Sequence, residues 1–189
     1  TRASPCEGHE SNDPYRRFLA ARHRAPGGPG MILSGVFTFH GPRSKVWEIL
    51  QDPSVLAKAL PGTKPLAGVG EDRYDGVMKV SVGPVNAAEF AVNVELKDKV
   101  APERFTMHIE GKGGVGFTKG SATIELAEVS EQAGPVTLMR YTSDVQVGGR
   151  IAAVGQRLLE SVGRMMAKQA LEALNKELQQ RLSSRESEP

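Results

Sequence analysis

Cysteine is almost absent from this chain of 189 residues, in which Cys6 is the only one. One cysteine cannot form an intramolecular disulfide, and it cannot supply the several thiolates that an iron–sulfur cluster requires. The four histidines lie far apart in the sequence without the spacing of metal ligands; they are His9, His23, His40 and His108. We therefore expect the chain to hold no metal or redox cofactor.

Long apolar runs and an excess of charge are also missing. No apolar stretch reaches about 18 residues, so no membrane-spanning helix is expected. Lysine and arginine number 24 against 22 acidic residues, a net charge of +2, and we expect no nucleic-acid partner. No Gly-x-Ser-x-Gly elbow surrounds Ser121 or Ser143, and the chain carries no other strong catalytic signature.

The first 30 residues differ from the rest in composition. They contain eight glycines or prolines and five arginines, and they show no sustained apolar period. This composition is typical of disorder, and we expect residues 1–30 to be a disordered leader upstream of a natural start at Met31. A basic arm for nucleic acid or membrane is the alternative interpretation. The stretch lacks the apolar core of a secretory signal, so a cytoplasmic protein is expected.

From Met31 onward the sequence predicts one α+β domain over residues 31–182, followed by a polar tail over 183–189. A strand comes first, and a helix that begins near Pro42 follows it. Asp52 is placed to cap a second, short helix. Several stretches then alternate apolar and polar residues with period two between turn residues; they are 73–82, 86–97, 104–110, 120–128 and 136–147. This alternation predicts an antiparallel sheet with one wet face.

The last part of the chain changes to a helical period. One long helix is predicted from Arg150 to Leu182, with an apolar stripe on one side; the stripe comprises Ile151, Val154, Leu158, Val162, Met165, Met166 and Ala170. Gly155 and Gly163 lie on or beside this stripe, where each costs about 1 kcal/mol of helix propensity against alanine. Such a cost predicts either a close backbone approach or space left empty.

A glycine-rich stretch, KGGVGFT at residues 112–118, differs by one residue from a phosphate-binding loop. Phe117 stands where that loop requires lysine, and the residues that follow alternate as a strand. A phosphate loop needs a helix at this point, because the amides at the start of the helix hold the phosphate. We therefore interpret the stretch as the turn of a β-hairpin.

Several stretches resemble the G-subunit family of carbon monoxide dehydrogenase; they are VWEILQDPSVLAKALPGTKPL, YDGVMKVSVGPVNAAEF, GKGGVGFTKGSATIEL and YTSDVQVGGRIAAVGQRLLES. The resemblance covers about Met31 to Ala173. It implies an α+β helix-grip (START-like) fold, in which a curved antiparallel sheet of about seven strands wraps around a long C-terminal helix. The family belongs to the START-like (SRPBCC) superfamily.

The resemblance also implies a function. Family members assist the assembly or membrane recruitment of carbon monoxide dehydrogenase-type molybdenum hydroxylases, and they carry no molybdenum, flavin or iron–sulfur cluster. We expect a non-enzymatic adaptor whose cavity accepts a lipid or a quinone, with hydroxylase subunits as partners, at the inner face of the cytoplasmic membrane. An enzyme of the START-like superfamily, such as a cyclase or a hydrolase, is the alternative, and it would need polar catalytic groups inside the cavity.

Small residues between the sheet and the helix are expected to leave the cavity open; they are Ala87, Ala88, Gly155 and Gly163. The predicted lining comprises Phe90, Val92, Met107, Ile109, Tyr141, Val145, Leu158, Val162 and Met166. The predicted mouth comprises Trp47, Leu56 and Leu60, because START-like folds open there. A filled core without a cavity remains the other interpretation of the same apolar residues.

The end of the long helix is expected to overhang the sheet. Leu171, Leu174, Leu178 and Leu182 form a narrow stripe there. This stripe is a candidate surface for a homodimer, for the partner enzyme or for a membrane. The surrounding residues carry too little positive charge to favour the membrane.

Overall fold

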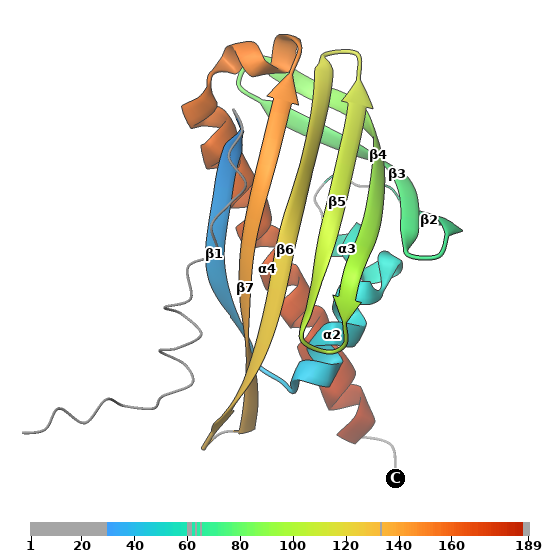
Figure 1. Ribbon diagram of the computed structural model, residues 1–189, viewed down its shortest axis with the longest axis vertical. Helices are drawn as coiled ribbons and strands as arrows, with labels where there is room; N and C mark the ends of the chain where they lie inside the picture. The colour runs from blue at the N-terminus through green and yellow to red at the C-terminus, as the bar shows by residue number, and fades with distance from the viewer. Residues whose placement is uncertain (1–29, 60–61, 63, 65, 133, 187–189) are drawn as a thin grey trace, which may run out of the picture.

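The computed structural model describes residues 30–59, 62, 64, 66–132 and 134–186 (Figure 1). Strand β1 and helices α2 and α3 come first, six strands follow, and a 3-10 turn (η1) leads into a long helix; the elements are β1 (Met31–Phe39), α2 (Arg43–Gln51), α3 (Pro53–Ala59), β2 (Ala67–Gly70), β3 (Arg73–Val82), β4 (Val85–Val100), β5 (Arg104–Gly113), β6 (Gly116–Glu131), β7 (Gly134–Gly148), η1 (Arg150–Val154) and α4 (Gln156–Glu186). The leader expected over 1–30 lies outside the described residues except for Gly30, as do Leu60 and residues 187–189.

The described strands form one antiparallel sheet in the order β1-β7-β6-β5-β4-β3-β2. β1 pairs with the last strand, β7, so that Leu33 lies opposite Ser143. Figure 1 shows the sheet curving around α4, with α2 and α3 at the lower end of the same face. The predicted helix-grip arrangement is confirmed.

Alternation along the strands separates the core from the outer face of the sheet. On β4, Phe90 and Val94 are each 3% exposed, whereas Ala91 and Asn93 between them are exposed. Burying an apolar side chain of this size contributes about 1.5–3 kcal/mol. The pattern read from residues 86–97 therefore gives the correct inward face.

The C-terminal half of α4 is part of the core, and the predicted overhang is wrong. Leu171, Leu174 and Leu178 are 8%, 4% and 1% exposed. They belong to one apolar cluster with residues of the sheet and of α2 and α3, including Phe39 and Ile49. The two short helices fold back over this end of the sheet and cover the helix there, so these three leucines present no surface for a partner.

The predicted helix from Arg150 is broken near its start. η1 ends at Val154, and Gly155 has a φ of 92°, which residues with a side chain rarely adopt. α4 begins after this glycine and runs for 31 residues, about 47 Å, to Glu186. It therefore includes the first four residues of the expected polar tail. Gly155 is exposed and has open space around it, so it does not line a contact with the sheet.

Asp52 joins three helices, as cap and as ion-pair partner. Its Oδ1 accepts hydrogen bonds from the backbone and the hydroxyl of Ser54 (2.9 and 2.6 Å), which is the predicted cap of α3. Its Oδ2 accepts a bond of 2.8 Å from Arg181 near the end of α4. Burial by itself would raise the pKa of Asp52, but these hydrogen bonds outweigh it and lower the pKa from 3.8 to about 2.

We expect Asp52→Asn to lower the free energy of unfolding by about 1 kcal/mol at neutral pH, since the carboxylate is partly exposed to solvent. A lowered pKa stabilises the fold above pH 3.8, and this contribution is lost as the pH falls through about 2. Urea unfolding at several pH values measures both quantities. A difference between wild type and variant that stays constant down to pH 2 would contradict a role for the charge.

Candidate ligand cavity

A cavity of about 290 Å³ lies between the N-terminal half of α4 and the concave face of the sheet. α4 contributes Leu159, Val162, Gly163 and Met166, and η1 contributes Ile151. The sheet contributes residues of six strands; they are Met31, Leu33, Met78, Val80, Val82, Phe90, Val92, Val94, Ile109, Phe117, Thr118, Gly120, Ser121, Ala122, Ser143, Val145 and Val147. The cavity thus occupies one end of the grip, and the buried leucines of α4 fill the other end.

Gly163 sets how closely α4 approaches the sheet. A Cβ at this position would lie 2.8 Å from Cδ1 of Leu33 and 3.7 Å from Cε of Met31. The glycine therefore permits close contact with β1, as its cost in helix propensity suggests. Of the other small residues expected to leave space, Ala88 is buried but does not line the cavity. The side chain of Ala87 lies outside the described part of the structure.

The predicted mouth does not open at α2 and α3. The indole of Trp47 packs edge-on against the ring of Phe105, with 5.5 Å between the ring centroids and an interplanar angle of 88°. Leu56 is half-buried against the same apolar cluster. Both side chains close the lower end of the core and lie outside the lining of the cavity. Leu60 lies outside the described residues.

Six of the predicted lining residues do line the cavity; they are Phe90, Val92, Ile109, Val145, Val162 and Met166. Met107 and Tyr141 pack against the buried cluster instead, and the Tyr141 ring lies against Gly35 of β1. Leu158 is 38% exposed and does not line the cavity, whereas the neighbouring Leu159 does. The reason is the orientation of α4, which turns Leu159, Val162 and Met166 toward the sheet.

Several lining residues were not predicted. Met78, Val80 and Val82 share one face of β3, and their alternation in residues 73–82 was a usable signal. Met31 and Leu33 reach the cavity because β1 pairs with β7, where Met31 lies opposite Val145. No short-range pattern in the sequence reveals this pairing.

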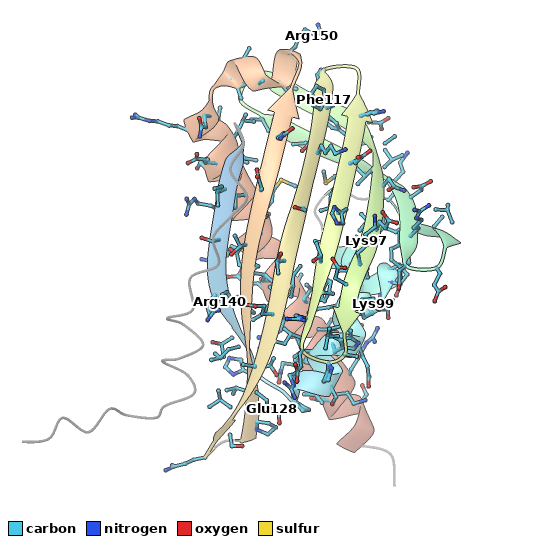
Figure 2. All side chains as sticks on the ribbon, in the orientation of Figure 1. Lys97, Lys99, Phe117, Glu128, Arg140 and Arg150 are labelled. Carbon is cyan, nitrogen blue, oxygen red and sulfur yellow. The ribbon has the colours of Figure 1, made fainter. Side chains whose placement is uncertain are left out.

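Among the described residues, no charged side chain lines the cavity. Its polar side chains are hydroxyls, and that of Ser143 donates to the backbone oxygen of Leu33 at 3.1 Å. Arg140, the charged residue that the sequence places next to Tyr141, lies on the opposite phase of β7 and forms an ion pair of 3.2 Å with Glu125 (Figure 2). Such a wall suits an apolar ligand, because burying an unpaired charge there is costly.

The described residues also bear on metals and membranes. They contain no group of three or more His, Cys, Asp or Glu side chains that could hold a metal ion. None of the helices in this part of the chain is long and apolar enough to cross a membrane.

Comparison with known proteins gives a family match and a set of similar folds. The family profile described as the carbon monoxide dehydrogenase G subunit (CoxG) matches residues 35–179. No curated protein matches the chain. A conserved protein from Geobacillus kaustophilus has a similar structure, with a TM-score of 0.74 and 29% identity over 79% of this chain and 96% of that one.

Two more distant structures share the fold. A START superfamily protein from Mycobacterium smegmatis has a TM-score of 0.60 and 12% identity, covering 79% of this chain and 97% of its own. The Zhui aromatase/cyclase from a Streptomyces species has a TM-score of 0.54 and 16% identity, covering 80% and 95%. At these identities the likeness shows the START-like helix-grip fold and nothing about activity.

Proposed function

Since the chain belongs to the G-subunit (CoxG) family of carbon monoxide dehydrogenase, we propose that it carries a hydrophobic small molecule, a lipid or a quinone. The observation behind this proposal is the cavity of about 290 Å³ whose described lining bears no charge. An apolar cavity of about 150 Å³ holds one benzene molecule. A cavity twice as large has room for two fused rings or for part of an alkyl chain.

Binding strength is expected to come from apolar contact. Each buried CH₂ contributes about 0.8 kcal/mol, so ten of them outweigh a single polar contact to a head group. Lining methionines such as Met31, Met78 and Met166 adapt to different ligand shapes, because their side chains are flexible. The apolar part of the ligand, more than its head group, should therefore set the affinity.

The role is proposed to be non-enzymatic and to serve a molybdenum hydroxylase of the carbon monoxide dehydrogenase type, by assisting its assembly or its recruitment to the cytoplasmic face of the membrane. Family membership supports this partner. The alternative, a START-like cyclase or hydrolase, would need an acid, a base or a nucleophile inside the cavity. The described lining offers only the hydroxyls of Thr118, Ser121 and Ser143, which favours the carrier.

Val162→Trp tests the cavity. The larger side chain projects from α4 into the cavity and should lower ligand affinity at least 100-fold while the protein stays folded. Ser161→Trp is the matched control, because the neighbouring Ser161 is exposed and does not line the cavity. Mass spectrometry of a solvent extract of the purified proteins identifies any native ligand. Titration with N-phenyl-1-naphthylamine, an uncharged apolar fluorophore, measures the affinity.

The proposal predicts a stoichiometric apolar species in wild type and in Ser161→Trp that is missing from Val162→Trp. Circular dichroism checks that each variant is folded, and Val145→Phe on the opposite wall is a second variant that fills the cavity. If wild type yields no such species and does not bind the fluorophore, the carrier function is wrong. If folded Val162→Trp and Val145→Phe bind as wild type does, the ligand lies elsewhere.

A further inference from the structure

We propose that the outer face of the N-terminal half of α4 docks on an anionic lipid surface, with the edge of the cavity beside the bilayer. The docking surface consists of Arg157, Leu158, Arg164, Met165 and Lys168. Its use for ligand exchange rests on the proposed carrier function. The docking itself can be tested independently.

Positive charge is concentrated in this half of the helix. Residues 156–170 contain three basic side chains and one acidic one, Glu160, whose carboxylate accepts a hydrogen bond from Gln156. Residues 171–186 contain three basic and three acidic side chains. The excess therefore lies over the cavity, and the half of α4 that packs in the core is balanced.

The three basic side chains share the outer face of α4. Arg157, Arg164 and Lys168 are spaced by seven and four residues, which places them on one side of a helix. The cavity-lining positions, such as Val162 and Met166, lie on the opposite side. Within the described residues, neither arginine forms an ion pair. Lys168 has only a long one, 3.8 Å to Glu172, with the two side chains 76% and 57% exposed.

Two large apolar side chains are exposed beside this basic face. Leu158 is 38% and Met165 52% exposed, and a spacing of seven residues places them on one side of α4. Cδ2 of Leu158 lies 3.2 Å from where a Cβ on Gly83 would stand, in the turn between β3 and β4. Val82, which precedes this turn, lines the cavity. Leu158 thus borders the cavity, and Met165 directly precedes Met166, which lines it.

This combination of exposed apolar and basic side chains on one helix is typical of a helix that lies in the membrane interface. Apolar side chains enter the boundary of the acyl chains, and basic ones meet anionic head groups. Each basic residue near such a surface strengthens binding about five-fold, so three strengthen it about 100-fold. A nucleic-acid site would not require the exposed Leu158 and Met165 at the border of an apolar cavity.

Sedimentation of the full chain with lipid vesicles tests the docking. Vesicles of phosphatidylcholine mixed with phosphatidylglycerol should bind the protein at low salt, whereas vesicles of phosphatidylcholine alone should bind it at least ten-fold more weakly. The triple variant Arg157→Gln/Arg164→Gln/Lys168→Gln should lose at least ten-fold in affinity for the anionic vesicles. Leu158→Ser/Met165→Ser should weaken the binding that remains at high salt.

The matched control is a triple variant on the outer face of the sheet, Lys97→Gln/Lys112→Gln/Lys119→Gln (Figure 2 labels Lys97). It removes the same amount of positive charge away from α4, and its affinity for the anionic vesicles should stay within two-fold of wild type. If this control loses as much affinity as the α4 triple variant, net charge explains the binding and the docking surface is wrong. Wild-type protein that stays in the supernatant with anionic vesicles also overturns the proposal, and it leaves this face of α4 to a protein partner or a second copy.

The same proteins titrated with N-phenyl-1-naphthylamine without vesicles separate the two proposals. The α4 triple variant should keep wild-type affinity for the fluorophore, which supports a surface role for these residues. A wild-type protein that binds anionic vesicles but not the fluorophore supports the docking and contradicts the carrier. A wild-type protein that binds the fluorophore but not the vesicles supports the carrier and contradicts the docking.

Discussion

Leu178→Ala is expected to lower the free energy of unfolding by about 3–5 kcal/mol. Leu178 is 1% exposed and belongs to the main apolar cluster. Its Cδ2 lies 3.1 Å from where a Cβ on Gly41 would stand, between β1 and α2, so little room exists for neighbours to fill the space left by alanine. Denaturant unfolding measures the change.

Met165→Ala is the matched control on the same helix. Met165 is 52% exposed, so its truncation should change the free energy of unfolding by no more than about 0.5 kcal/mol. A cost for Leu178→Ala below about 1 kcal/mol would contradict the observed packing and would restore the overhanging helix end expected from the sequence. The cost of truncating Leu178 distinguishes a buried helix end from an overhanging one, because the leucine periodicity is the same in both cases.

The sheet was predictable because each strand carries its own signal. Alternation in residues 86–97 identifies Phe90, Val92 and Val94 as inward-facing without any knowledge of their neighbours. The same local rule explains why the strand candidates of the cavity wall were mostly correct. Tyr141 and Met107 face the correct side but lie too far along their strands, because alternation gives the face and not the depth.

The packing of the helices was less predictable because it depends on contacts between distant residues. A stripe of leucines looks the same whether it faces solvent, a partner or a second layer of the same chain. Leu171 and Leu174 are buried because α2 and α3, more than a hundred residues earlier, cover them. This covering also explains why Trp47 and Leu56 close the core at the place where a mouth was expected.

Glycines gave a signal whose meaning depended on the surrounding structure. Gly155 and Gly163 both interrupt an apolar helical stripe in the sequence. Gly163 permits a close approach of α4 to Leu33, whereas Gly155 takes a positive φ and ends η1. Helix propensity shows that each glycine destabilises the helix relative to alanine. Only the fold shows whether a glycine is required there by a close contact or by the backbone conformation.

The glycine-rich stretch at residues 112–118 forms the predicted hairpin, since Gly113 lies opposite Gly116 where β5 turns into β6. Gly116→Ala is expected to lower the free energy of unfolding by about 2–4 kcal/mol. Gly116 has a φ of 147°, and a Cβ there would collide with the backbone oxygen of Gly148. Because neither backbone can move without disturbing the pairing of β6 with β7, the strain cannot be relieved locally.

Gly114→Ala is the control within the same turn. Gly114 has open space around it and no positive φ, so alanine there should change the free energy of unfolding by no more than about 0.5 kcal/mol. Thermal or denaturant unfolding of both variants measures the difference. If the two substitutions cost the same, the close approach of the hairpin to Gly148 is not what requires glycine. A large cost for Gly116→Ala alone supports the structural explanation, in which this glycine serves the sheet and not a phosphate.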